Sequence, residues 1–279
     1  MNRIGESLRL ALAGFGACSL IAGTALADDA SPWSNDLRSA ARLIAGSAPR
    51  EGAPLRAGIE IKMQPGFKTY WRYPGDAGVP PRFDFTGSDN VRTAKILWPA
   101  PHAFDDESGT SIGYKDTVTF PVQITPREPG RPVTLRLKID YAVCEKLCIP
   151  AEGRAELGLP RGASEFDGAI AAAEAKIPKP VAPGDIGLKA VRVSGALKPL
   201  VMLDLAAPNG EAYEIFVEGP NTEWAIPLPK PAPGAPAGRR HYEFVLDGVP
   251  PGVDPMGRFA LTFTIVGKDR AVETTTHLD

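Results

Sequence analysis

The stretch VTLRLKIDYAVCEKLCIPAEGRAELGL, residues 133–159, predicts the fold because apolar and polar side chains alternate along it. The odd-numbered residues of 133–143 are all apolar, and most of the even-numbered ones are polar. A period of two residues places the two sets on opposite faces of a β-strand, one facing a core and one facing solvent. Residues 155–159 predict a shorter returning strand, and Cys144 and Cys148 lie in the connection between the two.

The same alternation recurs along the rest of the chain, in residues 55–63, 201–205, 213–217, 242–246 and 259–265. The 29 prolines and 29 glycines indicate many turns, and therefore many short strands. Between the runs 213–217 and 242–246, PLPKPAPGAPAG (227–238) predicts a loop that cannot enter the interior of a sheet, since proline donates no backbone hydrogen bond. The chain is therefore expected to be all-β, with a second, smaller β-sandwich-like domain in its latter part.

One helix interrupts this pattern and marks a domain boundary. Ser164 and Asp167 resemble a capping box, and apolar residues then recur at helical spacing up to about Lys176. The Pro-rich segment 178–184 stops the helix and is typical of a semi-rigid linker. We therefore predict a first β domain over 28–177, including this helix, and a second over 185–279.

The first 27 residues predict export. Arg3 and Arg9 precede an apolar stretch, and Ala25-Leu26-Ala27 closes it before an acidic start to the mature chain. This is the pattern of a secretory signal peptide, so we expect cleavage after Ala27 and a periplasmic location in a Gram-negative host. The formal net charge of −2, without long runs of one sign, argues against a nucleic-acid binder.

Cleavage would remove Cys18 and leave Cys144 and Cys148 in an oxidising compartment, where close thiols tend to pair. Four residues of extended strand span about 13 Å, whereas disulfide-linked Cα atoms lie roughly 4.4–6.8 Å apart. The chain must therefore turn back between the cysteines for them to bond.

Three roles for the pair follow from its chemistry. A structural disulfide closing about five residues contributes only about 2 kcal/mol in the chain-entropy model, and a tight local disulfide is easily strained and exchangeable. Redox exchange is therefore the favoured interpretation, with a structural disulfide as the first alternative. The second alternative is a copper or other soft-metal site, because thiolates suit Cu(I).

Beyond the cysteines, an ordered series of motifs resembles a known family. The series comprises TYWRYPGDAGVPP (69–81), Trp98-Pro99, Gly113-Tyr114-Lys115, Phe120-Pro121-Val122 and DYAVCEKLCIPA (140–151). Together they resemble the periplasmic N-terminal domain of the DsbD thiol–disulfide interchange reductases, and more closely the N-terminal region of the ScsB branch. The resemblance runs from about residue 33 to 159 and continues more weakly beyond.

The resemblance implies an immunoglobulin-like β-sandwich whose cysteines exchange electrons without a cofactor. Cys148 would form the mixed disulfide and Cys144 would resolve it. Asp105 and Asp106 match the acids of a loop that shields the thiols in the family, where nearby carboxylates raise a thiol pKa. The aromatic residue expected after these acids is missing, and Phe104 is the candidate replacement.

The implied partners are a membrane-embedded electron donor similar to DsbD or CcdA, and periplasmic thioredoxin-like or disulfide-bearing proteins. Because the sequence ends at Asp279 without a membrane carrier, we expect a stand-alone exchange module. Tyr70, Trp71 and Tyr73 are interpreted as packing residues and His102 as an ordinary loop histidine.

Overall fold

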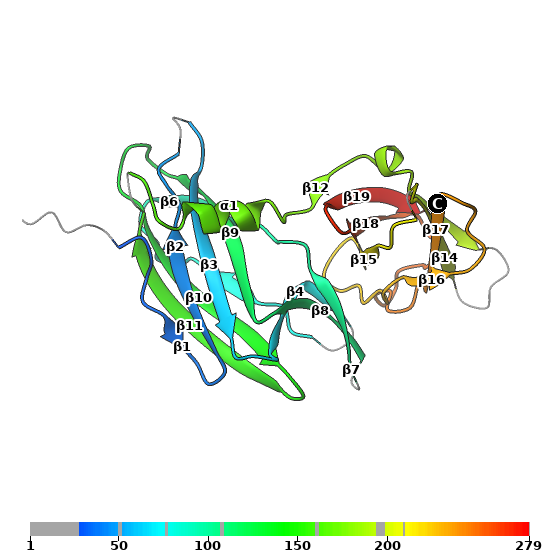
Figure 1. Cartoon of the computed structure of the whole chain (residues 1–279), viewed down its shortest axis with the longest axis horizontal. Coiled ribbons are helices and arrows are strands. Elements are labelled where there is room, and N and C mark those ends of the chain that lie inside the picture. Colours follow the sequence, from blue (N-terminus) through cyan, green and yellow to red (C-terminus); the bar gives the residue numbers. More distant parts are fainter. Residues whose placement is uncertain are drawn as a thin grey trace, which may run out of the picture.

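The computed structural model describes residues 28–49, 52–75, 78–106, 109–159, 162–193, 199–208 and 210–278. The predicted signal peptide, residues 1–27, lies outside them. Figure 1 shows two β-sheet bodies side by side, joined near α1 and β12. None of the described helices has the length and apolar character needed to span a membrane. The prediction of an all-β chain is confirmed.

The first sandwich contains two antiparallel sheets built from strands β1 to β11. One sheet has the order β1-β2-β3-β9-β6. The other, here named the cysteine sheet, has the order β11-β10-β4-β8-β7, with β5 paired to β10. The strands are β1 (Ser34–Asn35), β2 (Ser39–Ala45), β3 (Leu55–Met63), β4 (Lys68–Gly75), β5 (Arg82–Asp84), β6 (Val91–Ile96), β7 (His102–Asp106), β8 (Gly109–Lys115), β9 (Thr117–Pro126), β10 (Thr134–Cys144) and β11 (Cys148–Gly158).

The second sandwich also contains two sheets, ordered β12-β19-β18-β15 and β13-β14-β17-β16. Among its described strands, proline occurs in β12 and β16 alone, and both are outermost strands. Its elements are β12 (Lys179–Pro180), the 3-10 helix η1 (Pro183–Ile186), β13 (Lys189–Val193), β14 (Leu200–Ala206), β15 (Glu214–Glu218), β16 (Lys230–Ala232), β17 (Arg239–Val245), β18 (Phe259–Val266) and β19 (Ala271–Leu278).

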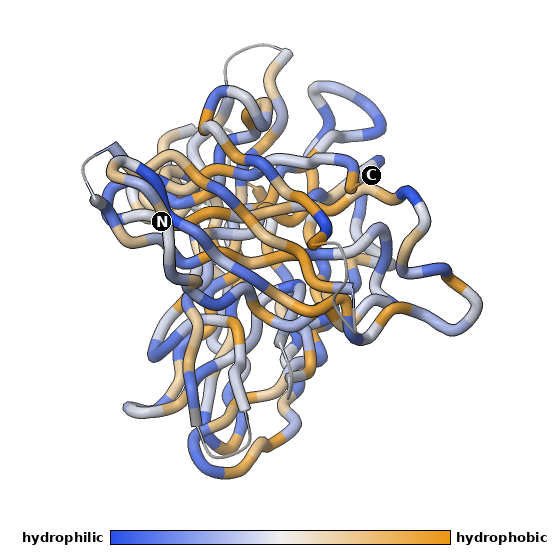
Figure 2. The backbone as a smooth tube through the Cα atoms, turned by 90° about the vertical axis from the view of Figure 1, so that its right-hand side faces the viewer, coloured by the Kyte–Doolittle hydropathy of each residue, from blue (hydrophilic) through white to orange (hydrophobic). Residues whose placement is uncertain are grey.

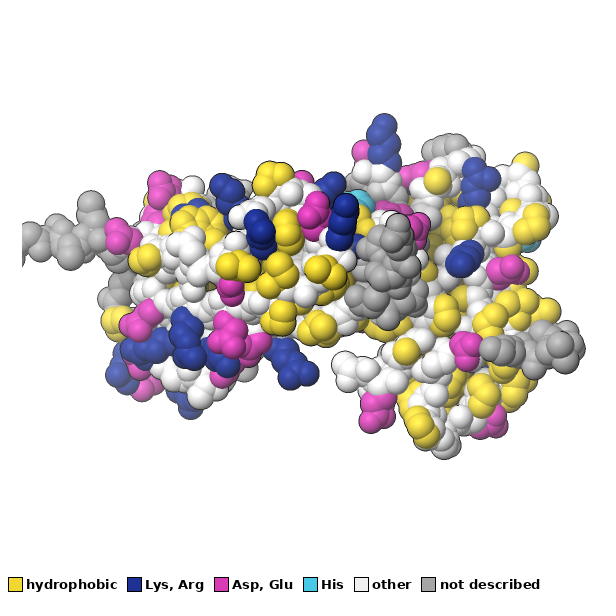
Figure 3. Space-filling model, turned by 90° about the horizontal axis from the view of Figure 1, so that it is seen from below, with side chains coloured by type: hydrophobic (Ala, Val, Ile, Leu, Met, Phe, Trp, Pro, Cys, Tyr) yellow, Lys and Arg dark blue, Asp and Glu magenta, His cyan; other side chains and the backbone are white. Residues whose placement is uncertain are grey.

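The cores form from the alternation seen in the sequence. In β10, Leu135, Leu137 and Ile139 are buried in the first sandwich, while the polar residues between them are only partly covered. In β14, Val201, Leu203 and Leu205 bury in the same way in a second cluster. Figure 2 shows long hydrophobic stretches on the strands that cross the middle of the molecule. On the face in Figure 3, acidic and basic side chains are interspersed, in keeping with the small net charge.

The predicted helix is present but shorter, as α1 (Asp167–Glu174), and it packs on the sheet that contains β3 and β9. The expected capping box does not form. Ser164 Oγ donates to the Ala45 carbonyl and accepts from Phe166 N, so it fixes the loop before the helix. Asp167 instead binds Arg56, which also binds Glu174. Tertiary partners therefore replace the local cap.

The segment predicted as a linker, 178–184, is partly built into the second sandwich. Lys179–Pro180 forms β12, which pairs in parallel with β19. The two sandwiches also contact each other directly, since Phe216 and Val266 of the second belong to the same apolar cluster as the core of the first. The division into domains at this segment stays a prediction.

Candidate redox site

The cysteines close the hairpin formed by β10 and β11. The register runs from Thr134 opposite Gly158 to Cys144 opposite Cys148, so the two cysteines are the last pair before the turn. Their Cα atoms lie 4.2 Å apart and a disulfide joins them. The turn residues between them, 145–147, are exposed. The chain thus turns back within three residues, as the pairing requires.

The two cysteines differ sharply in exposure. Cys144 is only 2% exposed and forms a small buried cluster with Tyr70 and Ala142. Cys148 begins β11 as an exposed residue at the tip of the hairpin. Rates of thiol–disulfide exchange depend on which sulfur is accessible. Of the two cysteines, Cys148 is therefore the one with exposed surface.

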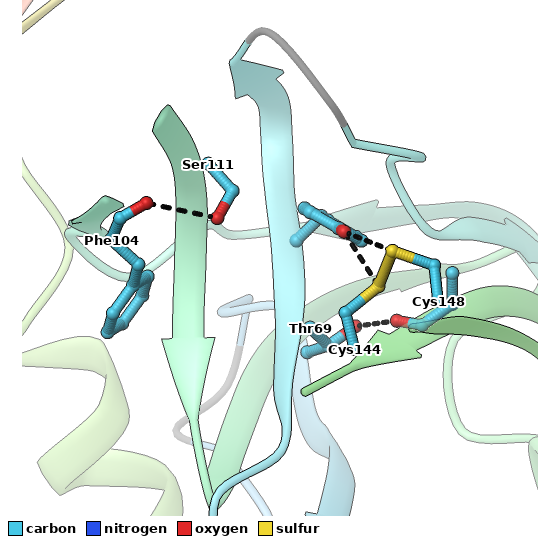
Figure 4. The surroundings of a disulfide bond; sticks show 7 residues. Thr69, Phe104, Ser111, Cys144 and Cys148 are labelled. Carbon is cyan, nitrogen blue, oxygen red and sulfur yellow. Dashed lines mark hydrogen bonds between the residues drawn. A yellow bond between two sulfur atoms is a disulfide. The ribbon is translucent and has the colours of Figure 1, made fainter. Parts of the chain in front are cut away.

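The hydroxyl of Tyr70 lies against both sulfurs, 2.7 Å from Sγ of Cys144 and 3.0 Å from Sγ of Cys148 (Figure 4). A disulfide carries no proton, so the tyrosine hydroxyl is the donor and shares its single hydrogen between the two sulfurs. Tyr70 is 1% exposed, and its neighbour Thr69 donates from Oγ1 to the Ala142 carbonyl at 2.9 Å. The donor is therefore held in place beside the disulfide.

The predicted acids lie elsewhere on the cysteine sheet. Asp105 is on β7, which β4 and β8 separate from β10, and the three strand spacings amount to about 14 Å. Its Oδ1 accepts a hydrogen bond of 2.6 Å from Thr110 Oγ1, and within the described residues no hydrogen bond joins it to either sulfur. Asp106 ends β7, and its side chain lies outside the described part.

Phe104, the candidate shield, also lies away from the disulfide. Figure 4 shows β4 and β8 between them. The Nζ atom of Lys68 is 5.8 Å from the centre of the Phe104 ring, and Lys68 is paired with Cys144 in the register of β4 and β10. Lys68 therefore extends from the strand beside the cysteines toward the edge strand that carries Phe104.

The sequence interpretation missed Tyr70 as a site residue. It lies within the motif 69–81, but an aromatic residue in a strand is more often part of a core, and nothing local shows that it reaches residue 144. Trp71 does pack in the core, and Tyr73 donates from its hydroxyl to the Ile226 carbonyl at 2.5 Å. His102 lies on β7 rather than in a loop and pairs with Glu214 at 2.8 Å.

Comparisons with known proteins give the family of part of the chain and the fold of most of it. Residues 38–160 match the family model described as "Thiol:disulfide interchange protein DsbD, N-terminal". Among solved structures, the chain is similar to the N-terminal periplasmic domain of ScsB from Proteus mirabilis, with a TM-score of 0.70 and 20% sequence identity. That likeness covers 90% of this chain and 98% of the other, so both sandwiches share its fold. A search of curated proteins finds no match. Residues 38–160 therefore belong to the DsbD N-terminal family.

Proposed function

We propose that this chain is a periplasmic thiol–disulfide exchange protein, passing electrons from a membrane-embedded reductase to oxidised periplasmic proteins through Cys144 and Cys148. The observation that carries the proposal is the asymmetry of the disulfide, because Cys148 is an exposed residue at the hairpin tip and Cys144 is buried. An attacking sulfur must be accessible, whereas a resolving sulfur needs only to reach its neighbour. The family match of residues 38–160 supports the same chemistry.

In the forward direction the Cys148 thiolate attacks a disulfide of the partner. A mixed disulfide forms, and the first partner sulfur leaves as a thiolate that takes up a proton. The Cys144 thiolate then attacks Sγ of Cys148, which releases the second partner sulfur and restores the Cys144–Cys148 disulfide. Two electrons and two protons pass to the partner. The reverse sequence, with a dithiol donor in the membrane, reduces the pair again.

Tyr70 contributes to this chemistry through its hydroxyl. A hydrogen bond to an ionised group favours the charged form, so this donor lowers the pKa of whichever cysteine is a thiolate beside it. Replacing Tyr70 by phenylalanine keeps the buried ring and removes only the donor. Such bonds contribute about 1.5–3 kcal/mol, which corresponds to a rise of about 1–2 units in the pKa of the Cys148 thiol.

The rate at which the Cys148 thiol is alkylated should change less than the fraction of thiolate. A rise of one unit in the thiol pKa lowers the fraction of thiolate at pH 7 about tenfold. The thiolate that remains is roughly threefold more nucleophilic, so the rate of alkylation should fall about threefold for each unit. Iodoacetamide labelling of the reduced protein across pH measures both quantities. Tyr114→Phe, which removes a buried hydroxyl from the neighbouring strand β8, is the control, because Tyr114 donates to the Pro99 carbonyl rather than to sulfur. If the pKa of the Cys148 thiol is unchanged in Tyr70→Phe, the Tyr70 hydroxyl has no role in setting it.

The alternative role, a structural disulfide, makes a different prediction. Replacing both cysteines by serine should lower the free energy of unfolding by only about 2 kcal/mol, because the closed loop is short. Exchange with oxidised glutathione, in contrast, should be lost completely. Urea unfolding and a reduction potential measured against glutathione test the two roles together. A potential below about −300 mV, typical of inert structural disulfides, would support the structural role and contradict electron transfer.

A further inference from the structure

Strand β4 has two sets of contacts on adjacent residues. Tyr70 reaches the disulfide, whereas the three residues that follow it contact the second sandwich. The rings of Trp71 and Phe216 lie 5.8 Å apart, Arg72 binds two carboxylates, and Tyr73 donates to the Ile226 carbonyl. Strand β4 therefore provides the hydrogen-bond donor to the sulfurs and also contacts the second sandwich.

The pairing of β4 within the cysteine sheet is irregular after Tyr70. Pairing with β8 is regular from Lys68 to Tyr70, which lies opposite Gly113, and then shifts until Gly75 lies opposite Ser111. On its other side β4 pairs with β10 only at Lys68. The regular register of β4 is therefore interrupted between Tyr70 and Gly75. Within this stretch Trp71 is buried in the core of the first sandwich, whereas the side chains of Arg72 and Tyr73 bind residues of the second.

Arg72 makes the strongest of these contacts. Its Nε donates to Glu218 at 3.0 Å, and its Nη2 donates to Glu218 at 2.7 Å and also to Glu273. The three side chains are 27%, 20% and 32% exposed, so solvent screens them only in part. Burial alone would lower the pKa of Arg72, but the hydrogen bonds and charges of the two carboxylates raise it above its ordinary value. The guanidinium also stacks 4.4 Å from the Trp71 ring.

A second contact with the cysteine sheet comes from the same sheet of the second sandwich, the one that contains β15 and β19. Glu214, two residues before Phe216 on β15, accepts a hydrogen bond of 2.9 Å from Ala103 N and pairs with His102. Both of these residues are on β7, the neighbour of β8. The second sandwich therefore holds two strands of the half of the cysteine sheet that carries Tyr70.

We propose that Arg72 is a positioning residue for the redox pair: by fixing β4 to Glu218 and Glu273 it holds the Tyr70 hydroxyl against the sulfurs, so the second sandwich tunes the reactivity of cysteines that it does not touch. This inference rests on the proposed function, and it assigns the second sandwich a role in it. Without the ion pairs, β4 loses its charged link to the second sandwich, and the hydroxyl of Tyr70, the residue two before Arg72, is expected to lie less closely against the sulfurs.

The test is a double-mutant cycle between Arg72→Ala and Tyr70→Phe, read out as the pKa of the Cys148 thiol. Arg72→Ala should raise this pKa in the same direction as Tyr70→Phe, up to the same size. In the Tyr70→Phe background it should cause no further rise, because the donor that Arg72 positions is already gone. Non-additivity of this kind identifies residues that act as a unit.

Arg56→Ala is the matched control. Arg56 is 26% exposed and also binds two carboxylates, Asp167 and Glu174, but on the sheet of the first sandwich that lacks the cysteines. It should destabilise the fold to a similar degree and leave the thiol pKa unchanged. Should Arg72→Ala compromise folding, the isosteric pair Glu218→Gln with Glu273→Gln removes the charges instead and should also raise the pKa.

The outcomes separate the two proposals. If the wild-type protein exchanges with oxidised glutathione but Arg72→Ala has the wild-type thiol pKa, the positioning role is refuted and the proposed function stands. The same holds if Arg72→Ala and Arg56→Ala shift the pKa equally, or if Arg72→Ala adds fully to Tyr70→Phe. If the wild-type protein itself shows no exchange with oxidised glutathione, the proposed function is contradicted, and the positioning role that rests on it falls with it.

Discussion

Replacing Cys148 by serine is expected to abolish exchange, so that the reduced variant, which keeps only the Cys144 thiol, reacts with oxidised glutathione at the background rate. The physical reason is access, since the remaining thiol of Cys144 is 2% exposed and lies behind the hairpin tip in a cluster with Tyr70 and Ala142. Burial in apolar surroundings also raises the pKa of a thiol and so removes the reactive thiolate. Stopped-flow or quenched-flow measurement of mixed-disulfide formation at pH 7 checks this.

Cys144→Ser is the matched partner of that variant. It keeps the exposed Cys148, removes the sulfur that would resolve the complex, and should accumulate a stable mixed disulfide. In a periplasmic extract the trapped species would reveal the natural partners as adducts that disappear with dithiothreitol. If Cys148→Ser traps partners as efficiently as Cys144→Ser, the assignment of attacking and resolving sulfurs is contradicted.

Trp71→Ala is expected to have the largest effect on stability. The side chain is fully buried, belongs to the core of the first sandwich and packs against Phe216 of the second. Removing a buried tryptophan costs about 3–5 kcal/mol, through lost burial and the cavity left behind. Urea unfolding followed by far-ultraviolet circular dichroism measures the loss without relying on tryptophan fluorescence.

Trp71→Phe provides the control for that change. It keeps an aromatic ring against Phe216 and removes the indole Nε1, which is buried and has no hydrogen-bond partner in the part of the chain that is described. The loss of stability should therefore be much smaller than for alanine. A change in Trp71→Ala within about 0.5 kcal/mol, the range of surface substitutions, would contradict the prediction that burial of this side chain stabilises the fold.

Much of the fold follows from the alternation of apolar and polar residues. The strand expected at 55–63 is β3 (Leu55–Met63), and the arms around the cysteines are β10 and β11. Such strands can be predicted because the alternation is local and burial of one face decides it. The same locality accounts for the cysteine pair, since four residues joined by a turn leave few other partners.

The sequence was less informative wherever a distant residue decided the outcome. The helix expected from about Ser164 is shorter, because Ser164 and Asp167 bind Ala45 and Arg56 instead of capping it. Asp105, predicted near the thiols by resemblance, lies on the edge strand β7. The order of strands in a sheet depends on how the whole chain folds. The spacing of residues along the sequence does not reveal it.

By itself, then, the sequence determined the all-β architecture, the hairpin and the pair of cysteines at its tip. Only the tertiary structure decided that Cys144 is buried, that Tyr70 donates to both sulfurs and that Arg72 joins Glu218 and Glu273. The reason is separation along the chain. Alternation acts between neighbours, whereas Tyr70 and Cys144 are 74 residues apart and Arg72 and Glu273 are 201 apart, so only folding brings their side chains together.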